Sequence, residues 1–131
     1  MPEPPAIRWD CRVRTPTRKR AVLVLIVALV VGLAVQPFRE LPGTDAVGSA
    51  MYAAAAVGVW ALLLPHRGAL LPGLIGTVLA CGVELWQLSE LPQRIAATVP
   101  GAGLVLGGVF DPLDLLWLVA GGLLATLVLA R

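Results

Sequence analysis

Glu84 and Gln87 are polar residues within a long apolar run, and their types and spacing could support binding or acid–base chemistry. An ionisable side chain inside a membrane span costs about 2.5 kcal/mol or more, so it needs a role. Glu84 lies roughly 6 Å from the end of the run, and Gln87 follows on the same helical face. The pair therefore predicts a polar site near one helix end. The alternative is a neutral or outward-reaching Glu84 that bonds a neighbouring helix.

Three further polar residues are expected near this site. Arg94 is the basic residue of the connection that follows the run, and Asp114 lies in the first turn of the next apolar run. Asp45 opens an earlier run, where helix capping alone would explain an aspartate. Asp111 and Pro112 are typical of the N-cap and the first helical position. The predicted cluster consists of Asp45, Glu84, Gln87, Arg94 and Asp114. We expect Glu84 and Arg94 to pair at its centre.

Such a cluster could bind a cation or a zwitterionic headgroup, or its charges could neutralise one another. The single histidine, His66, falls beyond the opposite helix ends, so no Ser-His-Asp arrangement forms here. No zinc spacing, phosphate-binding loop or dinucleotide fingerprint is present. Neither Cys11 nor Cys81 lies in a CxxC pattern. We therefore predict neither a metal nor a cofactor.

Four apolar segments must position the cluster, in a chain of 131 residues that is 58% hydrophobic and 14% charged. Soluble domains contain about 45–50% apolar and about 25% charged residues. Each segment has about the length that a helix needs to cross roughly 30 Å of hydrocarbon, where only helices satisfy the backbone of such a segment. The sequence predicts an all-α polytopic membrane protein, a four-helix transmembrane bundle. The expected helices cover about 21–38, 46–64, 69–88 and 112–130, within one domain, 21–131, after a basic arm, 1–20.

The basic residues predict the orientation of this bundle. Six of the ten precede residue 21, and four crossings would place Arg67 and Arg131 on the same side as these six. Arg39 and Arg94 would lie on the other side. The positive-inside rule then predicts cytoplasmic N- and C-termini in the cytoplasmic (plasma) membrane. The arm has no repeated alternation of basic and aromatic residues and no reader motif, so we do not expect it to bind nucleic acid.

Two other features concern the packing of the bundle. The connection 89–110 is long, largely apolar and rich in glycine. We expect an interfacial or re-entrant element on the outer side, with a plain surface loop as the alternative. Small residues are expected to mark close helix contacts. The candidates are Ala54, Gly58, Gly73, Gly76, Gly82, Gly121 and Gly122.

A short series of motifs resembles a known family. The residues that carry the likeness are Glu84-x-x-Gln87, Arg94, Gly107-Gly108-x-Phe110-x-x-x-Asp114 and Gly121. This pattern is similar to that of small bacterial membrane proteins grouped as domain of unknown function 2809, and its order also resembles that of the VanZ-like membrane proteins, which are tied to glycopeptide resistance and the cell envelope. The resemblance implies that Asp45 is the counterpart of an Asp that opens the second span. The chain departs from the pattern at Gly48, where a Trp is usual, and at Leu118, where a Tyr is usual.

These observations favour an accessory cell-envelope protein that binds a lipid headgroup or a membrane partner through the polar cluster. One alternative is an intramembrane enzyme acting on a lipid-linked phosphate or ester, with Glu84 as acid or base and Arg94 holding the anion. This alternative ranks lower because the sequence offers no evident nucleophile or metal site. The other alternative is a structural subunit of a membrane complex. The expected partners are membrane lipids, with a membrane protein or a second copy of the chain as a further candidate.

Overall fold

The computed structural model describes residues 15–106 and 108–131, and within them every regular element is helical. The elements are α1 (Arg18–Val35), the short 3-10 helix η1 (Gln36–Phe38), α2 (Thr44–Leu63), α3 (Leu70–Trp86), α4 (Leu91–Thr98), α5 (Ala102–Leu106) and α6 (Pro112–Ala130). The predicted all-α class is confirmed. The arm residues Arg8, Arg12 and Arg14, together with Cys11 and Gly107, lie outside the described residues.

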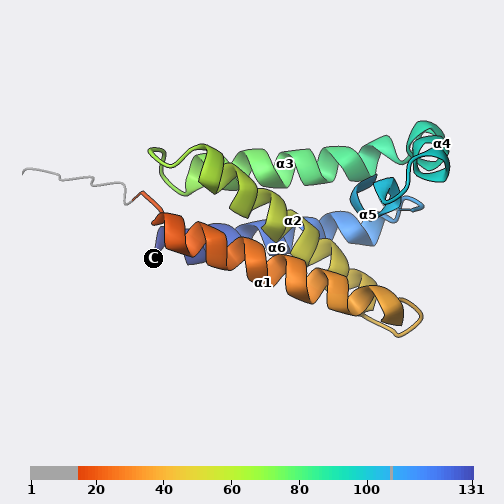
Figure 1. The fold of residues 1–131 in the computed structure, drawn as a ribbon, viewed down its shortest axis with the longest axis horizontal. Helices are drawn as coiled ribbons and strands as arrows, with labels where there is room; N and C mark the ends of the chain where they lie inside the picture. Colours follow the sequence, from red (N-terminus) through yellow and green to blue (C-terminus); the bar gives the residue numbers. More distant parts are fainter. Residues whose placement is uncertain (1–14, 107) are drawn as a thin grey trace, which may run out of the picture.

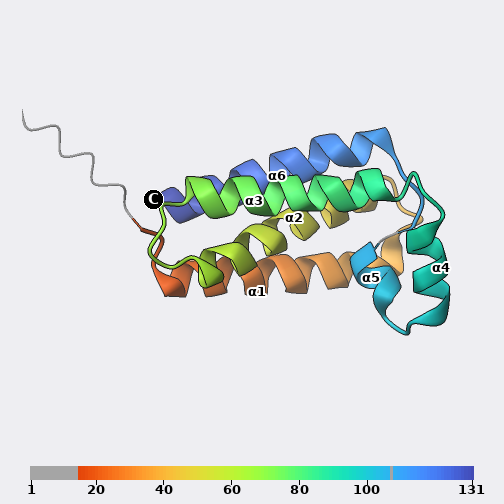
Figure 2. The same cartoon turned by 90° about the horizontal axis from the view of Figure 1, so that it is seen from above.

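The four long helices, α1, α2, α3 and α6, run along the length of the bundle (Figures 1 and 2). Helix α2 packs against α1, α3 and α6, and α3 also packs against α6, whereas α1 and α6 touch only slightly. The start of α1, the C-terminus and the turn between α2 and α3 share one end of the bundle. The short helices α4 and α5 lie at the opposite end.

Small residues allow the central helix to approach its neighbours closely. A Cβ atom at Gly76 would lie 2.6 Å from the backbone nitrogen of Val57, and one at Gly121 would collide with the carbonyl of Ala50. Such close packing is how helices associate in lipid, where the hydrophobic effect between them is weak. The predicted glycine contacts are confirmed except at Gly82, where a Cβ would meet nothing within 4 Å.

Three helical segments are long and apolar enough to cross a membrane: Arg18–Phe38, α2 and α6. Helices α3 and α4 together make a fourth candidate if this bent pair is one span. Large apolar side chains point away from the bundle, as Leu23 and Val30 of α1 do with 59% and 61% of their surfaces exposed. An apolar surface of this extent suits contact with acyl chains rather than water. The chain therefore forms a membrane-embedded bundle with three to four candidate spans.

Several helix ends differ from the expected ones. Helix α1 begins at Arg18 rather than at 21, so the last three residues assigned to the arm form its first turn. Helix α2 begins at Thr44, because Gly43 takes the N-cap position with a φ of 88°. Helix α3 ends at Trp86 rather than at 88, where the Ser89 hydroxyl donates a hydrogen bond to the Trp86 carbonyl (2.8 Å). The sequence could not place these ends because helix termini depend on local turns.

The long connection folds into α4 and α5. Helix α4 has Pro92 in its first turn, where the missing N–H costs nothing, and it leaves α3 at an angle of 92°. Gly101 then reverses the chain with a φ of 80°, which glycine adopts without strain. Helix α5 returns toward the bundle, and Leu104 and Val105 reach the cavity described next. The connection is therefore an ordered pair of helices across the end of the bundle.

Candidate functional site

A polar cavity lies at the end of the bundle that carries α4 and α5. Its volume is about 420 Å³, a size typical of small-molecule sites. Its walls come from the end of α1, the first turns of α2, the last turns of α3, helix α5 and the start of α6. Figures 1 and 2 show why these segments meet: α5 folds back toward the helix ends at this side of the bundle. The chain thus collects residues from five separate elements around one space.

Glu84 lies in the cavity wall near the end of α3, with only 8% of its surface exposed. Its Oε1 accepts a hydrogen bond from the backbone N–H of Asp111 at 3.1 Å. That N–H lies just before α6 and has no acceptor inside the helix, so the Glu84 side chain supplies the acceptor that the helix start lacks. Glu84 therefore faces the cavity and also joins the end of α3 to the start of α6.

Gln87 follows Glu84 on the same face of the chain and is equally buried, with 7% exposed. Its Nε2 donates a hydrogen bond to the carbonyl oxygen of Leu106, the last residue of α5, at 2.8 Å. Helix α5 has only five residues, so it depends on such tertiary contacts for its position. Gln87 thus holds α5 against the cavity.

The wall at the start of α6 carries Asp114, from the first turn of this helix. Its side chain hydrogen-bonds to that of Ser49 on α2, and Asp45, Asp111 and Arg39 lie near enough to interact with it electrostatically. Asp111 is the N-cap that was predicted, because its Oδ1 accepts from the N–H of Leu113 at 2.9 Å. This wall combines three carboxylates with one guanidinium.

Asp45 also lines the cavity, but it does not cap α2. The N-cap is Gly43, and no side-chain capping bond is made there. The Thr44 hydroxyl instead donates to the carbonyl oxygens of Leu41 (2.7 Å) and Phe38 (3.0 Å), which closes the turn before the helix. The capping explanation of Asp45 is therefore wrong, and its carboxylate remains available to the cavity.

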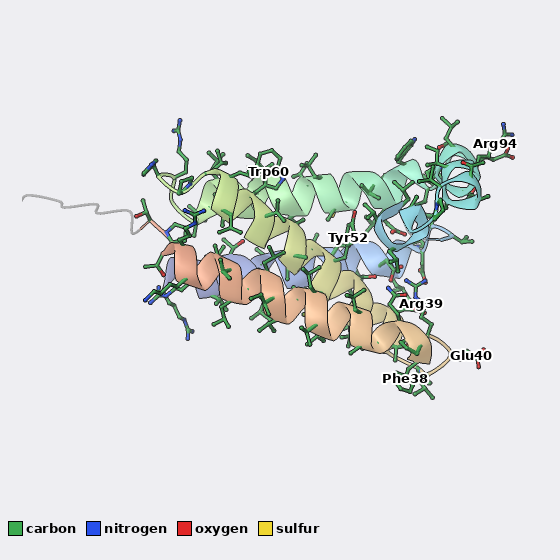
Figure 3. The ribbon with its side chains drawn as sticks, viewed as in Figure 1. Phe38, Arg39, Glu40, Tyr52, Trp60 and Arg94 are labelled. Atoms are coloured by element: carbon green, nitrogen blue, oxygen red, sulfur yellow. The ribbon has the colours of Figure 1, made fainter. Side chains whose placement is uncertain are left out.

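Arg94 does not reach the cavity, so the expected pairing of Glu84 with Arg94 is not formed. Its Nη2 donates to Oε2 of Glu90 at 2.7 Å, and both side chains are well exposed, 73% and 80%. Figure 3 shows Arg94 on the far side of α4, remote from Arg39 and Tyr52. The reason is the direction of α4, which carries Arg94 outward from the end of α3. Of the five predicted cluster residues, four line one cavity: Asp45, Glu84, Gln87 and Asp114.

Sequence reasoning missed several polar residues that also line the cavity, among them Arg39, Ser49 and Tyr52. Arg39 supplies the positive charge that was expected from Arg94. Tyr52 lies close enough to the Glu84 carboxylate to interact with it electrostatically. The helical spacing of Asp45, Ser49 and Tyr52 was a usable signal, because residues three and four apart share a helix face.

The carboxylates are neighbours, but their arrangement does not form a metal site. Within residues 15–106 and 108–131, no three His, Cys, Asp or Glu side chains are close enough together to hold a metal ion. Every buried side-chain nitrogen or oxygen of this part of the chain has a hydrogen-bond partner. Such an arrangement suits an extended ligand that several polar groups contact at different points.

Comparison with known proteins adds a family match. Residues 43–122 match the family described as protein of unknown function (DUF2809). The matched segment runs from the start of α2 into α6 and contains all five predicted cluster residues. No curated protein and no solved structure matches the chain.

Proposed function

The chain belongs to the DUF2809 family of proteins of unknown function, and we propose that it is a four-span membrane protein that binds a zwitterionic lipid headgroup in the polar cavity. The observation that carries the proposal is the composition of the cavity wall. Four carboxylates, of Asp45, Glu84, Asp111 and Asp114, line it together with one guanidinium, that of Arg39.

The charges in the wall match a headgroup that contains an amine and a phosphate. An ammonium group donates three hydrogen bonds, and carboxylates are its strongest acceptors. A guanidinium binds phosphate oxygens in the same charge-assisted manner. Since Arg39 lies beside Asp114, both parts of an ethanolamine-type headgroup find a partner on the same wall. The excess of carboxylates over basic groups disfavours purely anionic headgroups.

The basic residues support an orientation with this cavity on the outer side of the cytoplasmic membrane of a bacterium. Arg18, Lys19, Arg20, Arg67 and Arg131 all belong to the end that holds the start of α1 and the C-terminus. Arg39 and Arg94 belong to the cavity end, so the asymmetry follows the positive-inside rule. In this orientation α3 crosses the membrane as well, which adds a fourth span to α1, α2 and α6. Helix α4 then lies along the outer interface, perpendicular to α3.

Reporter fusions test the orientation. A fusion in the turn at His66 should report the cytoplasm, and a fusion at Gln93 on α4 should report the outside. The same location for both would contradict the four-span proposal, since α3 separates these positions.

Lipid binding tests the headgroup proposal directly. Detergent-purified protein would be equilibrated with micelles containing equal amounts of dioleoyl phosphatidylethanolamine and phosphatidylglycerol, and the retained lipids would be quantified. We expect selective retention of phosphatidylethanolamine. Glu84→Gln keeps a hydrogen-bond acceptor but removes the charge, and it should weaken retention by about tenfold. Arg39→Gln should also weaken it.

Matched controls exist for both variants. Glu90→Gln and Arg94→Gln make the same chemical changes at the same end of the bundle, but outside the cavity, and should leave retention unchanged. Equal retention of both lipids by the parent protein would refute the headgroup proposal. Release of free headgroup from the retained lipid would instead support the intramembrane enzyme.

A further inference from the structure

A second depression lies on the outer surface between α1 and α6, and it is almost entirely apolar. Its volume is about 200 Å³. Val27 and Ala28 of α1 form one side, Met51 and Ala54 of α2 form the floor, and Gly121 and Leu124 of α6 form the other side. The groove exists because α1 and α6 both pack on α2 but hardly touch each other.

This groove lies beside the polar cavity along the same helices. On α6 the cavity wall ends at Leu118 and the groove begins at Gly121, about 4.5 Å further along the axis. On α2 the cavity residue Gly48 and the groove residue Met51 are three positions apart, on one face of the helix. On α1, Val35 of the cavity and Ala28 of the groove are seven positions apart, which is two turns on one face. The two spaces therefore lie next to each other along the same three helices, one of them polar and the other apolar.

We infer that the groove holds one acyl chain of the same lipid whose headgroup occupies the cavity, so that the ligand is an intact phospholipid. This inference rests on the function proposed above and names its ligand class. The groove opens to the outer surface of the bundle, as shown by Leu124, which is 58% exposed. A membrane would surround this surface with acyl chains.

The lining of the groove suits an acyl chain, because it is apolar and several of its residues are small. An acyl chain is narrow enough to lie along the small residues Ala28, Ala54 and Gly121. Its attraction to the groove is of the van der Waals kind, because transfer from lipid to an apolar groove carries no hydrophobic gain.

Filling the groove tests the inference. Leu124→Trp places a large side chain in the groove. Because Leu124 is exposed, the larger side chain fits there without displacing the packed helices. Leu123→Trp is the matched control, since Leu123 is equally exposed (59%) and does not line the groove. Each variant would first bind a fluorescent phosphatidylethanolamine. Unlabelled dioleoyl phosphatidylethanolamine, or glycerophosphoethanolamine, which has no acyl chains, would then be added to compete with the fluorescent lipid for the protein. Elution volume and thermal unfolding verify the fold, and Val128→Trp provides a second blocking variant.

We expect Leu124→Trp to weaken binding of the dioleoyl lipid by about tenfold while Leu123→Trp leaves it unchanged. The parent protein should bind glycerophosphoethanolamine less tightly than the intact lipid. Unchanged lipid binding in both blocking variants would overturn the groove inference, and a loss in Glu84→Gln alone would then leave the headgroup proposal standing. If the parent protein bound the chainless compound as tightly as the lipid, the groove would contribute nothing. If neither Glu84→Gln nor Leu124→Trp weakened binding, both proposals would fail.

Discussion

The side chain of Glu84 accepts a hydrogen bond from the backbone N–H of Asp111, 27 positions further along the sequence, with 3.1 Å between Oε1 and the nitrogen. This bond connects the end of α3 with the start of α6 and spans the whole α4–α5 connection. Because Glu84 is buried, its side-chain oxygen and this N–H, which has no partner inside the helix, satisfy each other away from water. The same residue thus organises the cavity and supplies one of its polar groups.

Replacing Glu84 should separate these two roles. Glu84→Ala removes the acceptor and leaves the Asp111 N–H unsatisfied, so it should lower the free energy of unfolding by about 1–3 kcal/mol. Glu84→Gln keeps an acceptor at the same position and should cost clearly less. Thermal unfolding in detergent would measure both, with the exposed Glu90→Ala as the control. Equal losses for Ala and Gln would show that the hydrogen bond to Asp111 is not what stabilises the fold.

Gln87 should control the ordering of α5. In Gln87→Leu the Leu106 carbonyl loses its donor, so we expect α5 to open more often while the four long helices stay intact. Hydrogen–deuterium exchange should become faster over 102–106 and remain slow in α2 and α6. Gln93→Leu, on the exposed surface of α4, is the control and should not change exchange in α5. An unchanged exchange rate in Gln87→Leu would mean that apolar contacts alone position α5.

Glu84 and Arg94 should be energetically independent. Their side chains belong to different environments, one in the cavity and one in an exposed pair with Glu90. The losses in unfolding free energy of Glu84→Gln and Arg94→Gln should therefore add to within about 0.5 kcal/mol in the double variant. The exposed Arg94–Glu90 pair should itself contribute only about 0.3–0.5 kcal/mol. A double-mutant cycle would measure both quantities, and strong coupling between Glu84 and Arg94 would contradict the observed direction of α4.

Two glycines on α3 provide a matched test of the helix packing. Gly76→Ala places a Cβ atom 2.6 Å from the backbone of Val57, which forces α2 and α3 apart. We expect a loss of about 1–3 kcal/mol in unfolding free energy, as for other overpacked contacts. Gly82→Ala meets open space and should be neutral or slightly stabilising, because alanine favours helices. Similar effects of both substitutions on the unfolding temperature would argue against the close α2–α3 contact.

The sequence by itself determined the four long helices and the start of α6. The apolar runs predicted the long helices to within a few residues, because a chain segment in hydrocarbon has to satisfy its own backbone. Asp111 and Pro112 marked the start of α6 correctly, since a cap acts within a few residues of itself. Glu84 and Gln87 could be assigned to one face because helical spacing fixes it.

The tertiary structure alone decided which basic residue faces the carboxylates. Both Arg39 and Arg94 lie in connections at the same end, and nothing in their immediate neighbours distinguishes them. The chain leaves α3 at 92°, so α4 carries Arg94 outward to Glu90, whereas the turn after α1 brings Arg39 beside Asp114. That choice depends on backbone torsions in two turns and on contacts between residues far apart in sequence, such as the bond from Gln87 to Leu106. Local patterns do not encode such contacts, because each forms only when the helices have packed.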